Sequence, residues 1–191
     1  MKRKIITYLL VIIFFSCQNT KNDFQVLNEF VNNLEPQDLG RIQIALNEKK
    51  RISELTISYL GTKYIPEAVL KFVDLEYFSV LADSLISINK LKDLGKLSHL
   101  EIKKSNLLVF PDLNEFKVLN VLSLGNSNFN DTLKIEMTPE SLYELGINKN
   151  HNVKSIQILN YWNSKIKFLN ITFNDIRHLD SSIYKLPNLT H

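Results

Sequence analysis

The chain has 191 residues, of which 45% are hydrophobic and 23% are charged. This composition supports a folded domain with its own core and excludes a disordered or collagen-like chain. One cysteine excludes a disulfide framework, a zinc ribbon and an iron–sulfur cluster. The formal net charge of +3 resides in Lys2, Arg3 and Lys4, because 20 basic and 20 acidic residues remain after them. That balance gives no electrostatic support for nucleic-acid binding.

The first 17 residues have the organisation of a targeting segment. The basic residues at positions 2–4 precede an apolar run from Ile5 to Phe15, which is interrupted only by Thr7. Eleven residues are too few to span a bilayer comfortably, and they fit the apolar region of a signal peptide. Ser16 is a small residue at the end of the run, and Cys17 follows it directly.

This arrangement resembles a bacterial lipoprotein signal peptide. The resemblance implies that residues 1–16 are removed, that Cys17 carries the lipid, and that residues 17–22 form a tether. It also implies a cell-envelope protein anchored to a bacterial membrane, with the outer membrane or cell surface as the expected location. Two alternatives remain open: a plain thiol beyond an ordinary cleavage site, or an uncleaved signal anchor.

Residues 23–50 precede the repeats and are expected to cap the core. Phe24, Leu27 and Leu34 share one helical face, with Asp23 as an N-cap. Residues 37–47 are compatible with either a helix or a strand. In both cases the segment covers the first open end of the repeats.

Residues 51–191 repeat with a period of 22–24 residues. The repeats begin at residues 52, 75, 97, 119, 142 and 166, and a partial repeat begins at 189. This period is within the range of leucine-rich repeats. The clearest copy begins at Ile166 and has apolar residues at its first, fourth and sixth positions, with Asn174 at the ninth. The ninth position of the other copies holds, in chain order, Leu60, Asp83, Ser105, Ser127 and Asn150.

The pattern resembles a leucine-rich repeat protein. The resemblance implies an α/β solenoid, a right-handed superhelix with short parallel strands on its concave face and irregular or 3-10 returns on its convex face. Residues 128–141 and 151–161 are expected to be such returns, the second locally extended. For the C-terminal end, truncation of a longer array, docking on a partner and self-capping by residues 174–191 are all open.

No motif for catalysis, cofactor binding or metal binding is present. The sequence lacks the GxSxG, HExxH, P-loop and GxGxxG patterns, and no histidine has a second ligand at zinc spacing. The sequence therefore predicts a protein that is not an enzyme and needs no cofactor.

The alternation of side chains along a strand predicts which residues face a partner. Positions 3, 5 and 7 of each repeat point outward from the core, with Tyr77 and Phe168 as aromatic anchors. The predicted binding residues on this concave face are Tyr77, Ser79, His99, Glu101, Lys103, Val121, Glu144, Asn148, Phe168 and Asn170.

These observations predict a membrane-anchored recognition module for an unidentified protein, peptide or glycan. The alternative is a truncated or purely structural envelope protein without a specific ligand.

Overall fold

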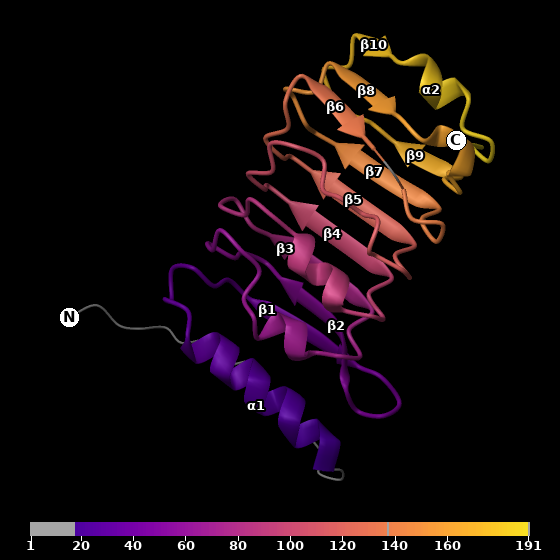
Figure 1. Ribbon diagram of the computed structural model, residues 1–191. Coiled ribbons are helices and arrows are strands. Elements are labelled where there is room, and N and C mark those ends of the chain that lie inside the picture. The colour runs from indigo at the N-terminus through magenta and orange to yellow at the C-terminus, as the bar shows by residue number, and fades with distance from the viewer. Residues whose placement is uncertain (1–17, 137, 191) are drawn as a thin grey trace.

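The structure is a computed structural model that describes residues 18–136 and 138–190. The predicted signal peptide and Cys17 lie outside the described residues. The described chain forms a stack of parallel strands with an N-terminal helix at one end and a short second sheet at the other (Figure 1).

A seven-stranded sheet runs the length of the molecule in the order β1-β2-β3-β4-β5-β7-β9. All neighbouring pairs are parallel except β1 and β2. The strands span Ile42–Leu46 (β1), Ile52–Ile57 (β2), Tyr77–Leu81 (β3), His99–Lys103 (β4), Val121–Gly125 (β5), Glu144–Asn148 (β7) and Phe168–Asn170 (β9). This arrangement confirms the predicted leucine-rich-repeat-like solenoid, with one parallel strand for each repeat that begins between residues 52 and 166.

The repeated apolar positions form one continuous core. Leu55, Leu100 and Leu145 are fully buried. Ile102 and Ile147, each two positions after one of these leucines, are also fully buried. Consecutive side chains on a strand point to opposite faces, so the residues between them face outward. The hydrophobic spacing therefore fixes which side chains are available to a partner.

Polar residues at the ninth position continue the core into the turns after β4, β5 and β7, where Ser105, Ser127 and Asn150 are buried. Asn150 is completely buried, and its side-chain carbonyl accepts from the backbone N–H of Ser127 at 2.6 Å. Its amide donates to the carbonyl of Leu124 at 3.2 Å. Ser105 and Ser127 share a hydroxyl–hydroxyl hydrogen bond of 2.6 Å. The two Asn150 bonds satisfy backbone groups that water does not reach, and the hydroxyl pair satisfies two buried side chains.

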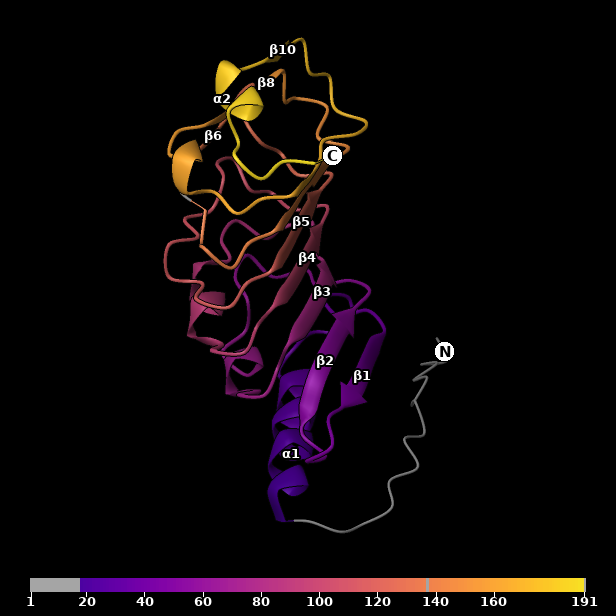
Figure 2. The ribbon, with the colours of Figure 1, turned by 90° about the vertical axis from the view of Figure 1, so that its right-hand side faces the viewer.

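The return segments change in character along the stack. The early returns contain the 3-10 helices η1 (Val69–Lys71) and η2 (Asn89–Asp93). The later ones contain a second parallel sheet in the order β10-β8-β6, formed by His178–Leu179 (β10), Ser155–Ile158 (β8) and Thr132–Ile135 (β6). Figure 2 shows β6 and β8 on the side opposite β2–β5. Residues 128–141 thus contain a strand where an irregular return was expected, because Leu133 and Ile135 alternate with exposed residues.

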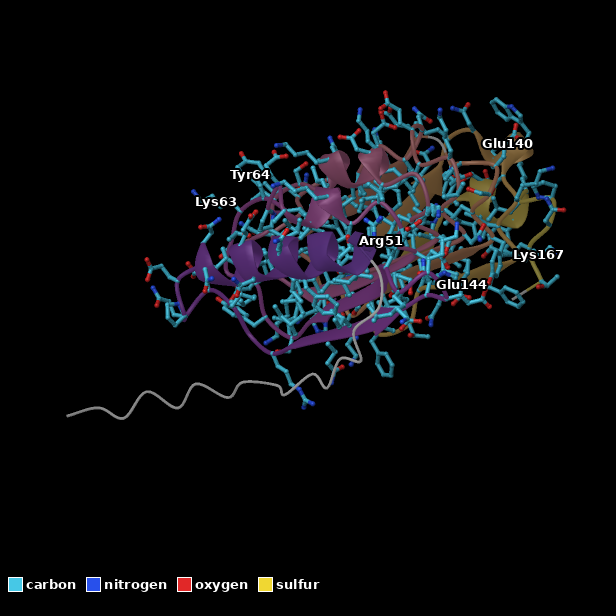
Figure 3. All side chains as sticks on the ribbon, turned by 90° about the horizontal axis from the view of Figure 1, so that it is seen from below. Arg51, Lys63, Tyr64, Glu140, Glu144 and Lys167 are labelled. Carbon is cyan, nitrogen blue, oxygen red and sulfur yellow. The ribbon has the colours of Figure 1, made fainter. Side chains whose placement is uncertain are left out.

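The N-terminal cap consists of α1 (Gln18–Asn32) and β1, which resolves the open choice for residues 37–47 in favour of a strand. The helix begins at Gln18, inside the segment expected to be a tether. Asp23 is therefore not an N-cap. It lies within the helix, 2% exposed, and pairs with Arg51 Nη2 at 2.7 Å (Figure 3 shows Arg51 beside α1).

The C-terminal end is covered by α2 (Ser181–Tyr184) and the chain after it. Asp180 caps this helix through the N–H of Ser182 at 2.9 Å. The hydroxyl of Ser182 accepts from the N–H of Ile158 in β8 at 3.0 Å. The N–H of Thr190 donates to the carbonyl of Lys167 at 2.9 Å, just before β9. These contacts join the last described residues to both sheets.

Candidate functional site: the strand face

The outward side of the seven-stranded sheet, called here the strand face, carries the residues predicted to meet a partner. Because the strands are in register, equivalent positions form rows across β3, β4, β5, β7 and β9. The first row is Tyr77, His99, Val121, Glu144 and Phe168. The second is Ser79, Glu101, Ser123, Gly146 and Asn170. The third is Leu81, Lys103, Gly125 and Asn148.

Glu101 is the centre of a hydrogen-bonded cluster on this face. Its Oε2 atom accepts from the hydroxyl of Ser79 at 2.7 Å and from that of Tyr77 at 3.4 Å. Its Oε1 atom lies 2.9 Å from Nζ of Lys103. The cluster joins β3 and β4 and holds the carboxylate in one orientation.

The same contacts determine the ionisation of Glu101. Burial raises the pKa of this carboxyl, but the hydrogen bonds from Ser79, Lys103 and Tyr77 outweigh burial. The net effect lowers the pKa of Glu101 below its ordinary value. Glu101 is therefore a fixed negative charge on the strand face at neutral pH.

Aromatic side chains lie at both ends of the first row. The rings of Tyr77 and His99 are 6.3 Å apart between centroids, and His99 Nδ1 lies 2.9 Å from the hydroxyl of Ser98. Phe168 packs edge-on against Tyr143, with the ring centroids 6.4 Å apart. Four strand spacings separate Tyr77 from Phe168, about 19 Å at the usual 4.8 Å per strand. The two predicted anchors thus belong to two separate patches.

The patch at Phe168 borders a shallow hollow of about 530 Å³. Glu144, Leu169, Asn170 and Thr172 also line it. Asn170 Oδ1 accepts from the hydroxyl of Thr172 at 2.9 Å, which orients the Asn170 side chain. Figure 3 shows Glu144 on the side of the sheet and Tyr64 on the side of the returns.

The middle of the strand face is shallow because its residues are small. A Cβ atom added to Gly146 would lie 3.2 Å from Asn148 Nδ2 and 3.3 Å from the hydroxyl of Ser123. Neighbouring side chains therefore pack closely around this glycine, and a larger residue would have to displace them. Val121 and Gly125 are half-buried beside it. Small side chains thus separate the aromatic patch at Tyr77 from the one at Phe168, and Glu54 on β2 continues the first row beyond Tyr77.

Sequence reasoning missed Phe173, whose side chain is 73% exposed and whose backbone has a φ of 57°. The left-handed conformation recurs at the same turn of three other repeats, at Lys104, Asn126 and Lys149. Each of these four residues directly precedes the ninth position of its repeat, so they are 22–24 residues apart. This regular spacing was the feature of the sequence from which Phe173 could have been selected.

The described residues contain no group of three histidine, cysteine or acidic side chains that could hold a metal ion. Within the same ranges, 18–136 and 138–190, no helix is both long and apolar enough to cross a membrane.

Comparisons with known proteins add little to the geometry. No family model matches the sequence, and no curated protein matches it. Among solved structures, the chain is similar to the leucine-rich-repeat ectodomain of the receptor kinase SOBIR1 from Arabidopsis thaliana. The two share 13% sequence identity over 87% of this chain and 97% of that chain, with a TM-score of 0.46. The fold assignment therefore rests on the strand register within this chain.

Proposed function

We propose that this chain is a recognition module that binds a protein through the strand face and is held at a bacterial membrane by a lipid on Cys17. The observation that carries the binding proposal is the Glu101 cluster, in which Ser79, Tyr77 and Lys103 orient one partly exposed carboxylate on the strand face. Orienting polar groups before binding reduces the entropy lost on association.

The chemistry of the face favours a protein partner with basic side chains. Three carboxylates lie on the face, those of Glu54, Glu101 and Glu144. Lys103 pairs with Glu101. Among the described residues, no ion pair involves Glu54 or Glu144. Complementary charge accelerates association and selects the partner. The aromatic side chains of Tyr77 and Phe168 supply the apolar contacts that dominate interface energies.

The test is cross-linking and mass spectrometry of the full chain in its own cells, with two matched double variants. Tyr77→Ala/Phe168→Ala removes both aromatic anchors of the strand face. Tyr64→Ala/Trp162→Ala removes two aromatic side chains that are 58% and 60% exposed but lie on return segments. We expect the first variant to lower partner recovery about tenfold or more, and the second to leave it unchanged.

Equal recovery by the two variants, with unchanged melting temperatures, would contradict binding through the strand face. It would favour the alternative of a structural envelope protein without a specific ligand. Recovery of a glycan in place of a protein would keep the site and change the class of ligand.

The membrane anchor is tested separately by metabolic labelling with a palmitate analogue. We expect the wild-type chain to incorporate the label and Cys17→Ser to lose it, because the thiol is the proposed attachment point. Two or more lipid chains anchor a protein stably, since each buried CH₂ contributes about 0.8 kcal/mol. Equal labelling of both chains, or of neither, would refute the lipid anchor and leave the binding proposal intact.

A further inference from the structure

The side of the molecule opposite the strand face contains a second hollow, of about 620 Å³. It lies between β6 and the return segments 86–89 and 107–112. Three apolar side chains of its lining are strongly exposed: Ile86 (41%), Leu108 (56%) and Val109 (67%). Its volume is within the range of sites that bind ligands.

One wall of the hollow is the free edge of β6. This strand is the last in the order β10-β8-β6, so it has a neighbour on one side only. Two carbonyl groups on this side of the chain pair with β8. That of Asp131 accepts from the N–H groups of Lys154 and Ser155, and that of Ile135 accepts from the N–H of Leu159. In a strand the backbone groups of alternate residues point to opposite edges. The N–H and C=O groups of Thr132 and Lys134 therefore point away from β8, toward the hollow.

The preceding return does not cover this edge. Among the described residues, the backbone hydrogen bond that joins this return to the start of β6 runs from the N–H of Asn130 to the carbonyl of Leu108, at 3.1 Å. A continued ladder would next pair Phe110 with Asn130 and Thr132, and the described residues form no such bonds. Pro111 follows at once and has no N–H to donate. The chain departs from β6 there, and the hollow occupies the space that a strand would fill.

We propose that this hollow binds an extended peptide segment of a partner, which adds to β6 as a strand. Unpaired donors and acceptors along a strand edge are a template for another extended chain. Four residues of β6 are about 13 Å long, which matches four or five residues of an added strand. The hollow has room for one such segment and not for the body of a second folded copy.

The walls define the side chains that the segment should carry. Ile86, Leu108 and Val109 offer an apolar surface, whereas the side chains of Thr132 and Lys134 are directed to solvent. An added strand presents its residues alternately to these two environments. We therefore expect apolar residues at alternate positions, with β-branched or aromatic types favoured. This site does not depend on the strand face, so either can fail without the other.

The probe is a displayed library of eight-residue peptides, selected on the full chain, from which the best binders are synthesised. Lys134→Pro removes one edge N–H, and proline is tolerated on edge strands. Lys134→Ala is the matched control, because it removes the same side chain and keeps the N–H. We expect Lys134→Pro to weaken binding about tenfold and Lys134→Ala to leave it within about twofold.

A second measurement keeps the test valid if Lys134→Pro does not fold. Two versions of one selected peptide are methylated on backbone nitrogens, one at odd and one at even positions, and are tested on the wild-type chain. We expect one version to lose about tenfold in affinity and the other to bind normally, because only alternate N–H groups face β6. Hydrogen exchange at Thr132 and Lys134 should slow in the complex.

Three results would overturn the proposal. The first is equal binding of both methylated peptides with unchanged exchange at Thr132 and Lys134. The second is a library that yields no peptide dependent on this edge. The third is a concentration-dependent dimer that Lys134→Pro abolishes, which would assign the edge to a second copy of the chain.

Discussion

The side chain of Asn174 accepts a hydrogen bond from the backbone N–H of Asn150, at 2.7 Å from nitrogen to Oδ1. Asn150 makes the equivalent bond to the N–H of Ser127, one repeat earlier, at 2.6 Å. Each asparagine therefore satisfies a backbone group of the preceding repeat. The turns of neighbouring repeats are linked through side chains, in addition to the ladder between their strands.

Replacing Asn150 should destabilise the whole stack. Asn150→Ala leaves the N–H of Ser127 and the carbonyl of Leu124 buried without these partners. We expect the free energy of unfolding to fall by about 2–4 kcal/mol, as measured by urea denaturation. Asn152→Ala, at an exposed position two residues later, is the control and should change it by less than about 0.5 kcal/mol. Similar values for the two variants would show that the buried bonds contribute little.

The N-terminal cap depends on an ion pair between distant residues. Asp23 in α1 accepts from Arg51 Nε at 2.8 Å, from Arg51 Nη2 at 2.7 Å, and from the N–H of Ile52 at 2.9 Å. Asp23→Ala leaves the partly buried guanidinium of Arg51 and the N–H of Ile52, at the start of β2, without these bonds. We expect a loss of about 3 kcal/mol and faster proteolysis within α1.

The matched control for the cap is Glu29→Ala. Glu29 is on the same helix and lies 3.8 Å from Lys71, but both side chains are more than half exposed. Exposed ion pairs contribute about 0–1 kcal/mol, so this variant should resist protease as the wild type does. Equal protease sensitivity of the two variants would show that Asp23 does not secure the helix.

The sequence predicted the main sheet because its signal repeats. Leu100, Leu122 and Leu145 occupy the same position in repeats 22 and 23 residues apart, so each copy supports the others. The second sheet has no such support, since β6 and β8 have four residues each and β10 has two. Asp23 and Arg51 are 28 residues apart, and nothing local indicates their contact. Alternation along the strands was enough to predict the outward residues of the strand face. The Glu101 cluster could not be predicted in this way, because its hydrogen bonds also depend on side-chain rotamers.

Acid should release the Glu101 cluster at a pH below the ordinary glutamate range. The bonds from Ser79, Lys103 and Tyr77, opposed by burial, hold the folded pKa of Glu101 below its ordinary value of 4.5. A lowered folded pKa means that the carboxylate stabilises the fold above the ordinary value, and that this contribution is lost as the pH falls through the folded pKa. NMR titration of the side-chain carboxyl carbon measures this pKa directly.

Ser79→Ala tests the cause of that shift. It removes the 2.7 Å hydrogen bond and leaves Lys103 in place, so we expect the pKa of Glu101 to rise relative to the wild type. Ser123→Ala removes a hydroxyl from the same row one strand further on and should leave the pKa unchanged. A pKa of Glu101 that does not move in Ser79→Ala would mean that Lys103 and Tyr77 hold the charge without Ser79.

The left-handed turn at Phe173 should cost stability that glycine can restore. Phe173 has a φ of 57° and a ring that is 73% exposed, near Lys149 Nζ at 5.9 Å from the ring centroid. Phe173→Gly and Phe173→Ala both remove the ring, so they lose the same contact with Lys149. They differ in the Cβ atom, which is disfavoured at this φ in alanine and absent in glycine. We expect Phe173→Gly to exceed Phe173→Ala in the free energy of unfolding by about 1 kcal/mol. If alanine is the more stable of the two, the turn is not strained, and the entropy that glycine adds to the unfolded chain dominates at this position.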